Sequence, residues 1–265
     1  MTPEAVIAEF EPPKKSVGWA QDAIRELSAS ATAFFQGNPT QIVTEVDPQT
    51  SEHIQKLRFP KPLPNSLARK ATEALVNARH AFDQAMFAAR NLVSGRSHKT
   101  IYYPWAQNPT DLEHLLRSRG IDQRLWDTIK VHEPYPGSHT YVGGNDLIRM
   151  LASMANDKHT VGLSVGGTIT SMRHPDVMFG SPGPGSFVEI LSPKWDPKKN
   201  EAETIRWKGD DIQVTGYYRT DFEILLQDSV PAHSVNAIRA LSDFAEKSKT
   251  VVETLQARCL ELVVP

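Results

Sequence analysis

Residues 65–91 read NSLARKATEALVNARHAFDQAMFAARN, and this stretch decides the fold that we expect. At about 100° per residue, its apolar side chains return to one side of a helix, and that side must be buried. These side chains are Leu67, Ala71, Ala74, Leu75, Ala78, Phe82, Ala85, Met86 and Ala89. Val76 and Phe87 project from nearly the opposite side. The pattern therefore predicts a central helix with neighbours on two sides.

A polar flank runs along the same predicted helix. It consists of Arg79, Asp83 and Arg90, with His80 beside them, and it matches no catalytic signature. Arg79 and Asp83 are four residues apart, a spacing that permits an ion pair on one helix face. One interpretation is a structural bridge that ties the helix to a neighbouring element. In the other, Arg79 binds an anionic group, and Asp83 orients that group or acts as a base.

The composition is that of an ordinary globular protein, with 40% hydrophobic and 23% charged residues. Twenty-nine basic and 31 acidic residues give a net charge of −2, which provides no general attraction to nucleic acid or anionic lipid. The single cysteine, Cys259, lies in an apolar helical pattern and is expected to be buried. We find no secretory signal and no apolar run of the ~20 residues that span a bilayer. A soluble, cytoplasmic protein is expected.

The first part of the chain alternates between helical and extended patterns. Three prolines within residues 1–15 predict a loosely held, flexible arm. Ser16 is expected to cap the helix that follows. Residues 40–47 and 52–59 are rich in β-branched side chains and show the alternating pattern of strands. A turn-forming segment separates them, so they are predicted to form a hairpin. Asn65 is expected to cap the central helix.

The remainder is predicted to be helix-rich to residue 158, strand-rich over 159–228, and helical again over 234–260, with Ser234 as the cap. Aromatic residues between the central helix and the next helix are expected to cover part of the core; they are Tyr102, Tyr103 and Trp105. Within the strand-rich part, Gly166-Gly167 and Gly209-Asp210 are each expected to be the turn of a hairpin.

The predicted fold class is α+β, because the strands come in antiparallel runs without alternating βαβ units. A central buried helix, a helical layer, an N-terminal hairpin, an antiparallel sheet and a long C-terminal helix would form a single domain over residues 16–265. The sequence shows no internal repeat and no low-complexity linker.

Over roughly residues 17–165 the chain resembles a family of uncharacterised bacterial proteins. Members carry a helix reading Asn-Leu-Arg-Ser-Ala-Leu-Asp-His, then a Gln-Pro-Tyr element and a helix end reading Asp-Lys-His. The corresponding residues here are Asn77-Ala78-Arg79-His80-Ala81-Phe82-Asp83-Gln84, Glu133-Pro134-Tyr135 and Asn156-Asp157-Lys158-His159. Gln84 stands where the family pattern has His, and Glu133 where it has Gln. The family has no established activity, so the resemblance implies a fold rather than a function.

Asp157, Lys158 and His159 have two interpretations. They can cap a helix end, where cations interact favourably with exposed carbonyl groups. Alternatively, Asp157 and His159 approach Asp83, His80 or His132 and offer ligands for a divalent ion. No HxH, HExxH or CxxC spacing supports a metal, so we expect neither a metal nor a cofactor. The strongest cluster of basic and aromatic residues consists of Lys194, Lys198, Lys199 and Trp195. These residues are explained equally well as the solvated rim of a hairpin and as a contact with nucleic acid.

Three functional hypotheses follow. The first is a module that binds a small molecule or a protein partner, with Arg79, His80, Tyr135 and Lys158 as candidate binding residues. The second is a hydrolase-like enzyme whose candidate catalytic residues are Arg79, Asp83, Asp157 and His159. The third is a structural homo-oligomer whose subunits pair through exposed strand edges or through aromatic residues.

Overall fold

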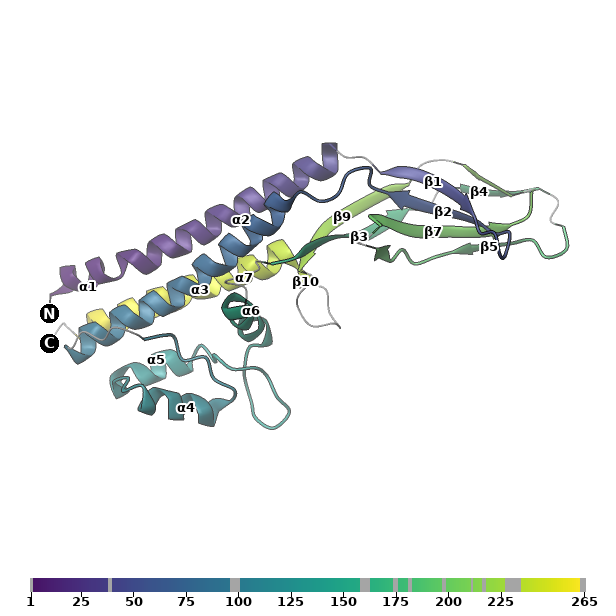
Figure 1. The fold of residues 1–265 in the computed structure, drawn as a ribbon. Helices are drawn as coiled ribbons and strands as arrows, with labels where there is room; N and C mark the ends of the chain where they lie inside the picture. The colour runs from purple at the N-terminus through teal and green to yellow at the C-terminus, as the bar shows by residue number, and fades with distance from the viewer. Residues whose placement is uncertain are drawn as a thin grey trace.

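The computed structural model shows an elongated α+β protein with helices at one end and sheets at the other (Figure 1). It describes residues 2–37, 40–95, 101–157, 163–173, 176–180, 183–196, 199–210, 212–215, 218–226 and 235–262. None of the helices within these ranges is both long and apolar enough to cross a membrane.

Three long helices form a bundle in which α3 is central. They are α2 (Glu11–Gly37), α3 (Asn65–Ser94) and α7 (Ala237–Glu261). Helix α3 packs against both α2 and α7 and runs alongside them (Figure 1). Every residue of its predicted apolar stripe is buried, and Ala81 and Ala88 beside the stripe are buried as well. The prediction of an enclosed central helix is therefore confirmed.

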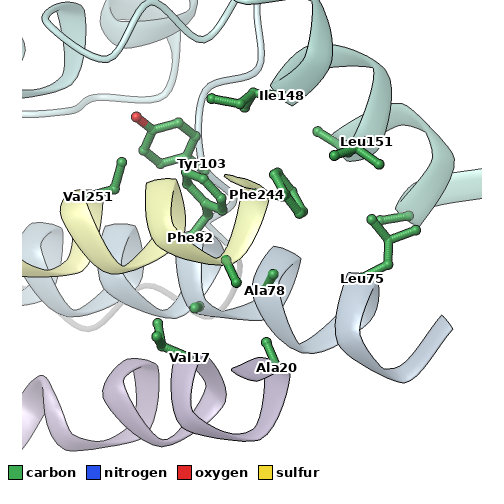
Figure 2. Packing of buried hydrophobic residues seen from close by; sticks show 14 of the residues in the cluster. Val17, Ala20, Leu75, Ala78, Phe82, Tyr103, Ile148, Leu151, Phe244 and Val251 are labelled. Atoms are coloured by element: carbon green, nitrogen blue, oxygen red, sulfur yellow. The ribbon is translucent and has the colours of Figure 1, made fainter. Parts of the chain in front are cut away.

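A helical layer lies along one side of the bundle (Figure 1). It contains α4 (Pro109–Ser118), the short 3-10 helix η1 (Gln123–Leu125), α5 (Trp126–Lys130) and α6 (Asp146–Asp157). Helix α6 contacts both α3 and α7. Where α6 meets the bundle, Phe82 of α3 and Phe244 of α7 lie between it and α2 (Figure 2). Their ring centroids are 5.4 Å apart, which is stacking distance.

The strands form three antiparallel sheets beyond the end of the bundle. The largest has the order β1 (Gln41–Val46), β2 (His53–Arg58), β7 (Glu201–Lys208) and β5 (Phe187–Ile190), with β6 (Trp195–Asp196) also on β7. The second has the order β10 (Val235–Asn236), β9 (Arg219–Leu226) and β3 (Val165–Arg173). The third pairs β4 (Asp176–Phe179) with β8 (Ile212–Thr215). The predicted N-terminal hairpin, β1–β2, is confirmed.

The prediction of a flexible N-terminal arm is wrong. Residues 3–9 form helix α1 (Pro3–Glu9), which contacts α7 and buries Val6 and Phe10 completely. Pro3 opens α1, and Pro12 and Pro13 fall in the first turn of α2. Backbone N–H groups in a first turn have no partner within the helix, so proline costs little there.

Of the three predicted helix caps, two are wrong and the third lies outside the described residues. Ser16 does not cap α2; it is buried within that helix and its hydroxyl donates to the Gln84 side chain at 2.8 Å. Asn65 is the first residue of α3, after Pro64 at the cap position. Ser234 lies outside the described residues, and Asn236 caps α7 by accepting from the Arg239 amide at 2.8 Å.

Neither predicted glycine hairpin forms. Gly166 and Gly167 are buried inside the continuous strand β3, which pairs with β9. A Cβ atom at Gly167 would touch Leu63 and Phe35, so the bare backbone lets these side chains pack closely. The chain leaves β7 at Gly209, where φ is +124°, and β8 then pairs with β4 instead of returning along β7.

Candidate functional site

The ion pair predicted on the central helix is present. The Arg79 Nη1 and Asp83 Oδ1 atoms are 3.0 Å apart, and the two side chains are 8% and 19% exposed. The guanidinium group of Arg79 lies over the Trp105 ring, 4.5 Å from its centroid. The Asp83 carboxylate also accepts the backbone N–H of Tyr103 at 2.8 Å. The pair therefore ties α3 to the chain segment that follows it.

We call residues 101–108, between α3 and α4, the connecting segment. Arg119, just after α4, donates from Nη1 to the carbonyl oxygens of Tyr102 at 2.9 Å and Tyr103 at 3.2 Å. Arg149, in the first turn of α6, donates from Nε to the Ala106 carbonyl at 3.1 Å. Side chains from three helical regions thus satisfy the backbone of a segment that has no regular structure of its own.

Tyr103 and Trp105 cover the core, as predicted, but the prediction for Tyr102 is wrong, because its side chain is exposed. The Tyr103 and Trp105 ring centroids lie 5.0 and 4.9 Å from that of Phe82. Tyr103 is 1% exposed, and burial raises the pKa of its hydroxyl. Figure 2 shows its ring between Phe82 and Ile148 of α6.

Positive charge exceeds negative charge around the connecting segment. Burial lowers the pKa of Arg79, the Asp83 carboxylate opposes this shift, and the charges of Arg149 and Arg119 add to it. Burial raises the pKa of Asp83, and the attraction of Arg79 opposes that shift. The charges of Asp83 and, to a smaller extent, Asp111 attract Arg119. Among the described residues, no carboxylate lies within ion-pairing distance of Arg119 or Arg149, both of which are half-buried.

Three buried donor atoms in this cluster have no hydrogen-bond partner in the described part of the chain. They are Arg79 Nε, the Tyr103 hydroxyl and Trp105 Nε1. Buried polar groups are rarely left unpaired, so each normally has an ordered water, an ion or a functional reason. The surplus of donors and the surplus of positive charge thus occur in the same place.

The other predicted site residues lie in different surroundings. His80 is exposed on α3, near enough for a positive charge on its ring to lower the pKa of Asp83. Tyr135 is buried, with its ring centroid 5.7 Å from that of Tyr141. Its loop touches the connecting segment, because the Ala106 amide donates to the Pro134 carbonyl at 2.9 Å.

The side chains of Asp157, Lys158 and His159 lie outside the described residues, so their convergence with Arg79 stays a prediction. The part of α6 that borders the Arg79–Asp83 pair is its first turn, which carries Arg149. After α6 the chain is next described at Leu163, whose amide donates to the Thr72 hydroxyl at 2.7 Å.

A second polar cluster joins the loop before α6 to helix α7. The His132 Nε2 atom is 2.8 Å from the Thr254 hydroxyl oxygen, and burial, with a smaller effect from Lys247, lowers the pKa of His132 to about 4. Glu133 has a positive φ of 48° and accepts the Gly144 amide at 3.1 Å. This cluster fixes the loop, and the neutral imidazole links it to α7.

Two hollows border these clusters. One of about 720 Å³ begins where the connecting segment ends and is lined by Asn108, Pro109, Thr110, Asp111, His114, Thr140 and Tyr141. Another of about 390 Å³ lies between the start of α6 and α7 and includes Lys247 in its lining. Within the described ranges, no three His, Cys, Asp or Glu side chains gather closely enough to hold a metal ion.

Sequence reasoning missed Arg119 and Arg149. They lie 40 and 70 positions along the chain from Arg79, in other predicted helical stretches, and no spacing rule connects them to it. The prediction for Cys259 is confirmed: it is fully buried, and burial raises the pKa of its thiol to about 12.

Comparisons of the chain with protein-family models, with curated proteins and with solved structures found no match, so the family resemblance stays a prediction.

Proposed function

We propose that the protein is a binding module that recognises an anionic group, a carboxylate or a phosphate, on a small molecule or a protein partner. Arg119 and Arg149 would contact the anion, and the Arg79–Asp83 pair would hold the connecting segment that positions them. The proposal keeps the cytoplasmic location expected from the sequence.

The observation that carries this proposal is the charge imbalance around the connecting segment. Arg119 and Arg149 each donate to a backbone carbonyl, and neither has a carboxylate partner among the described residues. A guanidinium group carries five N–H donors in a planar fork that matches carboxylate and phosphate oxygens. Both groups therefore retain donors after their backbone contacts, and an anion would also relieve the repulsion that Arg79 experiences.

The hollow of about 720 Å³ beside Asn108 supports the proposal, because it offers room for the rest of a ligand next to the connecting segment. Its lining combines the Asp111, His114 and Thr140 side chains with the ring of Tyr141, a mixture of polar and apolar groups that is common in ligand sites. The Tyr141 hydroxyl donates to the Pro136 carbonyl at 2.5 Å and also lies 3.2 Å from the Gln107 carbonyl oxygen, so the hollow and the segment share a wall.

The enzyme hypothesis receives less support. The Asp83 Oδ1 atom already accepts from Arg79 and from the Tyr103 amide, and the Trp105 ring covers the guanidinium group. A general base must reach the proton that it removes. Asp83 is better explained as a residue that organises the segment than as a base.

The test is binding of inorganic phosphate and of acetate, measured by calorimetry and by thermal unfolding at constant ionic strength. We expect saturable stabilisation with a dissociation constant near the millimolar range, about 4 kcal/mol of binding free energy. Arg149→Gln should weaken binding at least about tenfold, because a charge-assisted hydrogen bond contributes about 1.5–3 kcal/mol.

The matched control is Arg239→Gln, which removes an exposed arginine at the start of α7. This variant should bind both anions as the parent does. Arg149→Lys keeps the charge but not the planar fork, so it should recover only part of the affinity. Equal binding by the parent and Arg149→Gln, or stabilisation no greater than sodium chloride gives, would refute the proposal.

A further inference from the structure

Strand β1 is an unprotected sheet edge. It has one partner, β2, and no described strand pairs with its other side. Ile42 is 44% exposed and Val46 is 56% exposed. Natural sheets usually protect such an edge with lysine, proline or a bulge, and β1 contains no lysine and no proline.

The one charged residue of β1 does not protect the edge either. The Glu45 carboxylate is held by Lys56 at 2.7 Å and by Arg58 at 3.0 Å. Hydrogen bonds from these two side chains lower the pKa of Glu45. Its charge is therefore largely compensated within its own sheet and repels an approaching strand only weakly.

The hydrogen-bond pattern shows which backbone groups of β1 face away from β2. The Asp47 amide donates to the Glu52 carbonyl at 2.8 Å, so these two residues form a hydrogen-bonded pair. In an antiparallel ladder every second pair is of this kind. Counting back from Asp47, residues 45, 43 and 41 direct their backbone groups toward β2. Ile42, Thr44 and Val46 direct theirs away from the sheet.

We propose that β1 pairs antiparallel with β1 of a second copy of this chain, with Thr44 on the two-fold axis. In this register Ile42 faces Val46 of the second copy, and Thr44 faces Thr44. These are the residues whose N–H and C=O groups have no partner strand in the described part of the chain, so about six new hydrogen bonds form. The largest sheet of each copy then continues into that of the other.

Self-complementarity selects a second copy as the occupant of this edge. A two-fold axis makes every contact occur twice, so Ile42 and Val46 form two apolar pairs on the same face of the joined sheet. On the other face, Glu45 lies opposite Val43 of the second copy rather than opposite another carboxylate. Moving the axis to Val43 would place Ile42 opposite Thr44 and lose both apolar pairs.

The contact is small, which sets the expected affinity. A standard stable interface buries about 800 Å² on each partner, and the pairing of one six-residue strand buries less. We therefore expect a dimer that dissociates on dilution, with a dissociation constant in the micromolar range. This inference does not depend on the arginine cluster, which lies on the helical part of the molecule.

Sedimentation of the full chain across a range of concentrations tests the proposal. The parent should change from monomer to dimer, and the double variant Ile42→Lys/Val46→Lys should remain monomeric with an unchanged melting temperature. The matched control is Ile190→Lys, which places a lysine on β5, the opposite edge of the sheet, at a residue that is 57% exposed. This control should dimerise as the parent does.

Cysteine cross-linking tests the register without altering the apolar pairs. Across the axis the two Thr44 Cα atoms would be about 5.5 Å apart, whereas the two Gln41 Cα atoms would be about 20 Å apart. A short thiol cross-linker should join Thr44→Cys into dimers and leave Gln41→Cys unjoined. Cys259 is fully buried and should not react in the folded protein. A monomeric parent at all concentrations, a dimer that survives the double lysine substitution, or equal cross-linking at both positions would overturn the proposal.

Discussion

Asp83→Ala should destabilise the protein far more than the loss of an exposed ion pair would. The carboxylate holds the Arg79 guanidinium at 3.0 Å and the Tyr103 amide at 2.8 Å, and the Arg79 side chain is only 8% exposed. Its removal leaves a buried positive charge that Arg119 and Arg149 repel. Breaking one partner of a buried pair costs about 3–5 kcal/mol, and the 19% exposure of Asp83 favours the lower end.

We therefore expect a loss of about 3 kcal/mol in the free energy of unfolding, measured by urea denaturation followed by circular dichroism. The melting temperature should fall by roughly 6–12 °C. Arg79→Met should be destabilising as well, and the double variant should cost at least about 1 kcal/mol less than the sum of the two single variants. A loss below about 0.5 kcal/mol for Asp83→Ala, or simple additivity in the double variant, would refute the claim that the pair is buried and coupled.

Four further predictions concern single positions. The pKa of His132 is lowered to about 4 from 6.5, so the unfolded chain takes up the proton first as the pH falls. The free energy of unfolding should therefore fall by about 2 kcal/mol between pH 7.5 and pH 5. Melting curves of His132→Gln should show a smaller loss over the same range. Tyr103→Phe removes a buried hydroxyl without a described partner and should leave the free energy of unfolding unchanged or raise it by up to about 1 kcal/mol in urea titrations. Gly144 has a φ of +101°, and an added Cβ would lie 2.5 Å from the Pro136 carbonyl oxygen, so Gly144→Ala should cost about 2 kcal/mol. By contrast, Gly18→Ala, inside α2 with free space around it, should stabilise by about 0.5–1 kcal/mol in the same titrations.

The helical part of the fold could be predicted because its signals are local. The apolar stripe of α3 repeats over many turns, and the Arg79–Asp83 pair follows from a four-residue spacing on one helix. The prediction for the N-terminal prolines is wrong because it counts them without regard to position. Proline destabilises the interior of a helix but is tolerated in the first turn, where these prolines lie.

Strand pairing could not be predicted because its partners are distant in the sequence. Arg58 of β2 pairs with Glu201 of β7, and no local pattern links these residues. The same holds for the candidate site, where Arg119 and Arg149 reach the connecting segment only after the helical layer has packed. Sequence spacing predicts the ion pair on α3 but does not predict that Arg119 and Arg149 lie near it.

Hydrogen exchange of the α3 backbone amides tests the central claim most directly. If α3 is enclosed by α2, α6 and α7, its amides between Ala74 and Ala89 should be among the slowest in the molecule and should exchange only on global unfolding. The Tyr103 amide, held by Asp83, should share this protection in the parent and lose it in Asp83→Ala. Exchange of the α3 amides as fast as those of the peripheral helix α4 would contradict the account.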